Sequence, residues 1–101
     1  MYAMTGKLFA QPGKTDALAG ILLRASELVS GMPGCHAYIV MADVKDASAI
    51  WVFEMWKDKE SHDASLKDER VRSLIAEAMP MMGGAPEGSE LKILGGYGIS
   101  E

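Results

Sequence analysis

The chain has 101 residues, of which 49% are hydrophobic and 24% are charged. These proportions are ordinary for a globular protein, so they predict one domain over residues 1–101 and exclude a disordered or low-complexity chain. Fourteen acidic residues outweigh ten basic ones, which gives a net charge of −4. Since the basic residues form no cluster, we expect no nucleic-acid partner and no membrane partner.

The use of cysteine and the N-terminal sequence bear on the compartment. Cys35 is the single cysteine, so it has no partner for an internal disulfide, which favours a reducing environment. Residues 1–10 lack the pattern of a signal peptide. The longest apolar run, residues 49–53, is too short to cross a membrane. We therefore expect a cytoplasmic protein.

The hydrophobic pattern changes period several times along the chain. The predicted elements are a strand at 2–9, a helix at 15–30, strands at 35–42 and 49–56, a helical region from 58 to 79 with a break near 67–68, and a strand at 90–94. Apolar residues recur three and four positions apart in the helices, whereas β-branched and aromatic residues enrich the central strands. Gly31 and Pro80 end the two main helices.

This βαββαβ order predicts an α+β fold of the ferredoxin-like type, an antiparallel sheet with its helices on one face. In the two central strands, however, neither face is polar. The strand at 35–42 is expected to place Cys35 with Ala37, Ile39 and Met41 on one face and His36, Tyr38 and Val40 on the other. Because the helices cover only one face, we expect a second copy to cover the other and form a homodimer. A strongly curved sheet that closes partly on itself is the alternative.

No motif for a phosphate loop, a nucleophilic serine or a zinc site is present. His62, near the start of a helix, is a candidate proton shuttle, or else a half-exposed surface residue. Trp56, at the end of a strand, offers an indole N–H to a ligand, or else packs in the core or an interface.

Four further residues are candidates for the wall of a binding cavity. Tyr38 offers a phenol to a ligand, or else packs in the core or an interface. Ser65, one turn after His62, can hydrogen-bond a ligand or else the helix backbone. Met79 suits a soft, adaptable pocket wall or plain packing. Glu54 would have a raised pKa if it faced an apolar cavity; a salt bridge or a position at the sheet rim is the alternative.

Several segments resemble the antibiotic biosynthesis monooxygenase domain, and in particular the small bacterial quinol monooxygenases. They are residues 54–58, 61–63 and 65–66, followed by Val71, Leu74, Ile75 and the Ala78-Met79-Pro80 sequence. The resemblance covers nearly the whole chain. It implies a dimeric α+β barrel, in which two copies pair through their sheets.

Active members of this family oxidise electron-rich phenols or quinols with O₂, without flavin, haem or metal. The resemblance thus implies a cofactor-independent monooxygenase acting on a small aromatic quinol or phenol, with Trp56 as a pocket donor. Many relatives have histidine where this chain has Ser65, and asparagine where it has Val52. A non-catalytic dimer that binds an aromatic ligand or serves in a stress response is therefore the alternative. Haem is not expected, because Gly6 stands where haem-degrading relatives carry asparagine.

Overall fold

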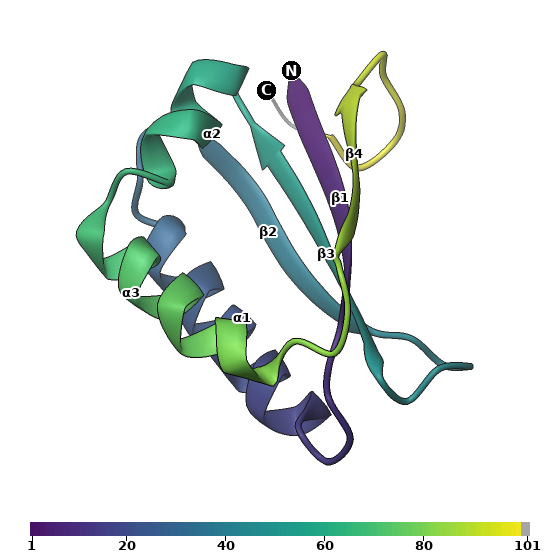
Figure 1. The fold of residues 1–101 in the computed structure, drawn as a ribbon. Coiled ribbons are helices and arrows are strands. Elements are labelled where there is room, and N and C mark those ends of the chain that lie inside the picture. Colours follow the sequence, from purple (N-terminus) through teal and green to yellow (C-terminus); the bar gives the residue numbers. More distant parts are fainter. Residues whose placement is uncertain (100–101) are drawn as a thin grey trace.

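The computed structural model describes residues 1–99. Its elements are β1 (Tyr2–Phe9), α1 (Thr15–Val29), β2 (Cys35–Ala42), β3 (Ala49–Trp56), α2 (Lys59–Ser65), α3 (Glu69–Ala78), a 3₁₀ turn η1 (Met79–Met81) and β4 (Glu87–Lys92). The strands form one antiparallel sheet in the order β2-β3-β1-β4. The helices form a layer over one face of it (Figure 1). The predicted ferredoxin-like α+β fold is confirmed.

The last strand begins earlier and ends earlier than the prediction of residues 90–94. In β4, Glu87 pairs with Lys7, and Gly88 pairs with Gly6. A Cβ atom at position 88 would lie 3.4 Å from the carbonyl oxygen of Thr5, so glycine suits this close pairing. Pairing with β1 therefore holds residues 87–89 in a strand, although their composition is typical of a loop.

A β-bulge at the start of β2 changes which side chains share a face. Cys35 pairs with Trp56, whereas Ala37 pairs with Met55, so one residue is extra on β2. Cys35 consequently packs on the same face as Tyr38, against the core around Trp56. The predicted grouping of Cys35 with Ala37 is wrong, because strict alternation does not hold across a bulge.

The core lies between the helix layer and the face of the sheet that it covers, here called the helix-side face. Leu18 of α1 and Trp56 of β3 are its largest fully buried side chains. Burial of a leucine side chain such as Leu18 stabilises the fold by about 1.5–3 kcal/mol. A continuous core follows, because α1 packs against both the sheet and α3.

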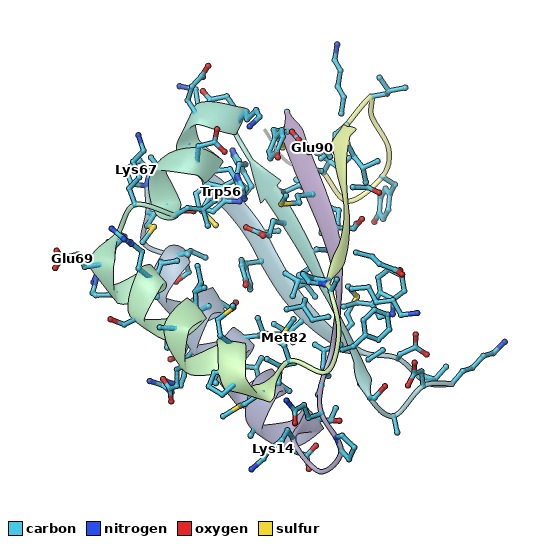
Figure 2. The ribbon with its side chains drawn as sticks, viewed as in Figure 1. Lys14, Trp56, Lys67, Glu69, Met82 and Glu90 are labelled. Carbon is cyan, nitrogen blue, oxygen red and sulfur yellow. The ribbon has the colours of Figure 1, made fainter. Side chains whose placement is uncertain are left out.

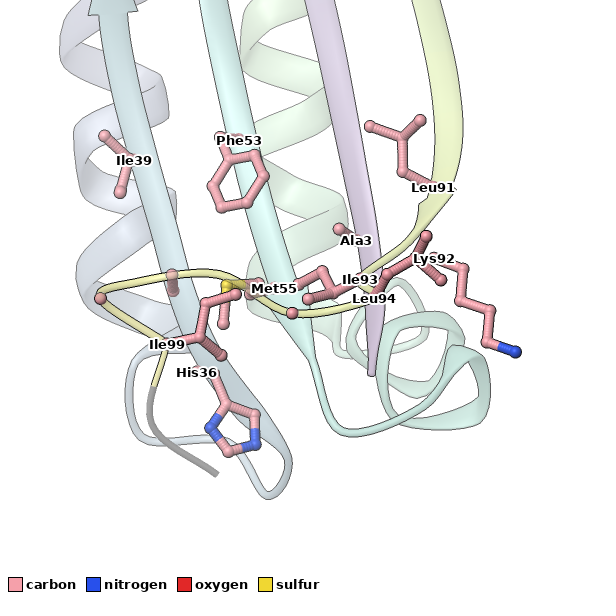
Figure 3. Close-up of a pocket in the computed structure, with 13 residues that line it drawn as sticks. Ala3, His36, Ile39, Phe53, Met55, Leu91, Lys92, Ile93, Leu94 and Ile99 are labelled. Carbon is pink, nitrogen blue, oxygen red and sulfur yellow. The ribbon is translucent and has the colours of Figure 1, made fainter.

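The opposite face of the sheet, here called the outer face, carries no helix. Its apolar side chains include Ala37, Ile39, Met41, Trp51, Phe53 and Met55. Ile39 remains 49% exposed. Residues 93–99 cross one end of this face and border a hollow of about 790 Å³ with His36, Phe53 and Met55 (Figure 3). Since β2 and β4 are edge strands, the sheet does not close on itself within residues 1–99.

Candidate functional site

A cavity of about 250 Å³ lies between the helix-side face of the sheet and the helices. Most of its lining is aliphatic, and the polar side chains on its wall are Tyr38, Glu54 and Ser65. Trp56 lies towards the α2 end of the space between the layers, and Met82 lies towards the opposite end (Figure 2). The arrangement is a small apolar chamber with a few polar groups, which is the usual form of a site for a small molecule.

Glu54 is the carboxylate of this cavity. Strand alternation puts it on the helix-side face of β3, between the buried Val52 and Trp56. Its side chain is only 15% exposed. Burial raises the pKa of Glu54, an effect that the hydrogen bond from Trp56 and the proximity of His62 partly oppose. Glu54 therefore lies at the cavity rather than at the sheet rim, and it is a stronger base than an exposed glutamate.

His62 lies directly behind Glu54, on α2. It is 5% exposed, so it is not the half-exposed surface residue of the alternative interpretation. Its Nε2 lies 3.9 Å from Glu54 Oε1, and its Nδ1 lies 3.0 Å from Asp63 Oδ1. The rings of Tyr2 and Trp56 lie 5.4 and 5.9 Å from the imidazole, centroid to centroid. These contacts hold the ring between a buried and a half-exposed carboxylate.

The indole of Trp56 is fully buried and is absent from the cavity wall. Its Nε1–H donates to Glu54 Oε1 at 3.0 Å. The N–H that the sequence suggested for a ligand oxygen is thus already engaged with a carboxylate. Trp56 fixes the orientation of Glu54, and it can influence a bound molecule through that residue.

Tyr38, on β2, contributes a phenol to the cavity wall. Its backbone carbonyl accepts a hydrogen bond from Ser26 Oγ at 2.8 Å, which ties this part of β2 to α1. Burial, together with the nearby carboxylate of Glu54, raises the pKa of the Tyr38 phenol far above its usual value. The hydroxyl therefore remains protonated at any physiological pH and can donate a hydrogen bond.

The other two predicted wall residues also border the cavity. Ser65 is buried, and its Oγ–H donates to the carbonyl of His62 at 2.6 Å, which leaves the oxygen free to accept. Met79 is 65% exposed and lies on the rim, near the half-exposed Ile75. The structure therefore brings Tyr38, Ser65 and Met79 to one cavity, with Glu54 between them and the buried His62.

The sequence alone did not show that Glu54 lies at the cavity, in contact with Trp56 and close to His62. The available signal was a charged residue at a position whose neighbours two residues away on the strand, Val52 and Trp56, are apolar. Alternation assigns all three to one face, but it does not show which face the helices cover near position 54.

Within residues 1–99, no group of three His, Cys, Asp or Glu side chains is arranged to hold a metal ion. None of the described helices is long and apolar enough to cross a membrane.

The family model described as antibiotic biosynthesis monooxygenase matches residues 1–77. The chain belongs to this family. A solved structure from Chloroflexus aurantiacus J-10-fl that carries the same family name is 42% identical, with a TM-score of 0.87 and coverage of 98% of each chain. No curated protein matches the sequence.

Two more distant members of the antibiotic biosynthesis monooxygenase family, by their names, share the fold. The protein from Nitrosomonas europaea is 16% identical, with 93% of this chain and 99% of that chain covered and a TM-score of 0.87. The protein from Caulobacter crescentus CB15 is 20% identical, with 93% and 90% covered and the same TM-score of 0.87. The family resemblance seen in the sequence is confirmed by the match to the family model and by the relative that is 42% identical.

Proposed function

We propose that this family member is a cofactor-independent monooxygenase that oxidises a small aromatic quinol or phenol with O₂ in the helix-side cavity. The observation that carries the proposal is the Glu54 carboxylate, whose side chain is only 15% exposed, on the wall of a mostly aliphatic cavity. Such a carboxylate can remove a phenolic proton where water is scarce. The monooxygenase class of the family supports the same assignment.

The size and charge of the cavity favour a small, neutral substrate. Its volume of about 250 Å³ is below the roughly 300–1,000 Å³ typical of sites for drug-sized ligands. Its lining includes no lysine, arginine or histidine. A substrate that arrives as an anion would be placed beside Glu54 without bringing the proton that a neutral phenol or quinol leaves in the site, and so without a compensating positive charge, which is unfavourable in an apolar site. We infer that the substrate is a neutral aromatic molecule with one ring or two fused rings.

The cavity residues suit each step of such an oxidation. Glu54 accepts the proton of a substrate hydroxyl, and the resulting anion transfers an electron to O₂. The radical pair combines to form a C–O bond, and the O–O bond then breaks with loss of water. For a quinol the products are a hydroxyquinone and H₂O, so the substrate supplies all four electrons that reduce O₂. Tyr38 donates a hydrogen bond to the developing peroxide, and Ser65 accepts one from a second hydroxyl.

This oxidation predicts O₂ uptake that depends on the protein. With a panel of neutral hydroquinones, we expect one O₂ consumed per quinol, and one atom of ¹⁸O₂ in the product. Reactions without protein correct for spontaneous oxidation. Equal rates of quinol consumption with and without O₂ would end the assignment.

The alternative is a dimeric protein that binds an aromatic ligand without converting it. Val52, which stands where active relatives carry an amide, is buried in the core and cannot contact O₂ through a polar group. In that case quinones would quench tryptophan fluorescence in a saturable way, since Trp56 lies next to the Glu54 side chain on the cavity wall. No O₂ uptake would accompany binding.

We also propose that a second copy covers the outer face and forms a homodimer. Phe53, in the centre of this face, would be buried against the partner. Phe53→Arg would place a charge in that apolar contact, and we expect it to weaken association at least about a hundredfold. Sedimentation velocity measures the change. Val44→Arg is the matched control, because Val44 lies in the 43–48 hairpin and is 98% exposed. A Phe53→Arg protein that sediments like the unaltered dimer would refute the interface.

The reducing cytoplasm remains the expected compartment. Cys35 is a free thiol in the part of the chain that the structure describes, and it is partly buried. Burial and the nearby Glu54 both raise the pKa of the Cys35 thiol, which lowers its reactivity as a thiolate. These properties favour a packing role for Cys35.

A further inference from the structure

The proton that Glu54 removes must be kept away from the substrate anion until O₂ has reacted. If it stayed on Glu54, it could return to the substrate oxygen before electron transfer. Written with the hydroxyquinone in its un-ionised form, the oxidation within the site releases no net proton, because the second product is water. The site therefore needs a group that holds one proton for a time and then gives it back.

His62 has the position and the protonation geometry for this task. Both oxygens of Asp63 are engaged, Oδ1 with His62 Nδ1 at 3.0 Å and Oδ2 with Lys59 Nζ at 3.1 Å. These two contacts lower the pKa of Asp63, so it is an ionised acceptor. An ionised carboxylate accepts hydrogen bonds only, so Nδ1 must carry the hydrogen of the neutral imidazole. The unprotonated Nε2 then faces Glu54 Oε1.

We propose that Glu54, His62 and Asp63 form a proton-storage chain, in which His62 takes the substrate's proton from Glu54 and returns it when water forms. Asp63 is the positioning residue of the chain, because it fixes the tautomer of His62. This inference rests on the proposed oxidation in the cavity. The present separation of 3.9 Å between Nε2 and Oε1 has to shorten for transfer, as catalytic contacts commonly do once substrate is bound.

Charged and aromatic side chains enclose the imidazole of His62. The imidazolium would lie between two carboxylates, Glu54 and Asp63, with Lys59 paired to the outer oxygen of Asp63. The Tyr2 ring packs against His62 from β1. On β2, Tyr38 lines the cavity and Cys35 packs against the core around Trp56; burial raises the pKa of both side chains, so they stay neutral. Neither competes with His62 for the proton.

The test is Asp63→Asn, with Glu60→Gln as the matched control. Both variants remove one negative charge from α2. Glu60, however, is exposed and is not one of the three residues of the proton-storage chain. An asparagine can donate to Nδ1 and so allows the opposite tautomer. We expect Asp63→Asn to lower kcat at least about tenfold with KM unchanged within about twofold, as in other sites where a carboxylate orients a histidine. Glu60→Gln should leave both constants unchanged.

The tautomer is measured independently of turnover by ¹H–¹⁵N NMR of the imidazole groups. The chain has two histidines, so a His36→Gln variant assigns the spectrum. We expect hydrogen on Nδ1 of His62 in the unaltered protein and a shift towards Nε2 in Asp63→Asn. Hydrogen on Nε2 in the unaltered protein, or a changed tautomer with unchanged kcat, would overturn the storage chain. Absence of O₂ uptake by the unaltered protein would instead refute the proposed oxygenase activity. The tautomer of His62 would still show whether Asp63 orients the imidazole as the proton-storage chain requires.

Discussion

Glu54→Gln should remove most of the O₂ uptake and at the same time stabilise the protein at alkaline pH. Glutamine fills the same space and can still accept the hydrogen bond from Trp56, but it cannot take up a proton. Loss of a general base typically lowers the rate by about 10²–10⁴-fold. We expect a decrease of this size in kcat, measured with an oxygen electrode at saturating quinol.

The stability change in Glu54→Gln follows from the direction of the pKa shift. Burial raises the pKa of Glu54 in the folded state, so the folded state binds this proton more tightly than the unfolded chain does. The resulting stability is fully present below the unfolded pKa of roughly 4.3 and is lost as the pH rises through the folded pKa. Glutamine is not subject to this loss. The Tm of the variant should therefore exceed that of the unaltered protein at pH 8, by more than at pH 4.

Glu87→Gln provides the control for both measurements, since Glu87 is exposed on β4. It should change neither kcat nor the pH dependence of Tm. A Glu54→Gln protein with full activity would show that another group takes the substrate proton. A lower Tm at pH 8 would show that the Glu54 carboxylate contributes more through its contacts with Trp56 and His62 than it costs by burial.

Gly34→Ala should destabilise the fold by about 2–5 kcal/mol, through left-handed backbone strain and a steric clash. Gly34 has a φ of +84°, and a Cβ atom there would lie 2.6 Å from Ser61 Oγ and 2.7 Å from Ser61 Cβ. Its carbonyl also accepts a hydrogen bond from the Lys57 amide at 2.7 Å. The turn before β2 is thus pressed against α2. Urea denaturation measures the loss.

Gly13→Ala separates the two causes of this loss. Gly13 has a similar φ of +78°, but a Cβ atom there would meet no other atom within 4 Å. It should therefore show the backbone strain alone, about 1–2 kcal/mol. If both alanine variants lost the same stability, the contact with Ser61 would be of no consequence. Gly34→Ala should also lower kcat, because α2 carries His62 and would have to shift.

The local patterns of the sequence were sufficient for the order of the elements. The apolar spacing in α1 and the break between α2 and α3 are confirmed, since both depend on neighbours within a few residues. The bulge at Cys35 and the start of β4 at Glu87 were not predicted. Both depend on pairing with a strand that is distant in sequence, and no local periodicity reports that register.

The candidate site was predictable in part for the same reason. Tyr38, Ser65 and Met79 were chosen by residue type and predicted position, and all three border the cavity. The roles of Trp56 and His62 depended on which side chains meet in space. Their partner is Glu54, and only the packing of α2 against β3 brings Glu54 and His62 together.

The four-stranded sheet separates the cavity on its helix-side face from the apolar outer face. Every polar group assigned to the reaction comes from one chain and lies on the helix side, whereas the apolar outer face points the other way. Two copies joined through their outer faces would have their reaction chambers back to back, separated by two thicknesses of sheet. Each chamber would then be complete in itself, and damage to one would neither impair nor be rescued by its neighbour.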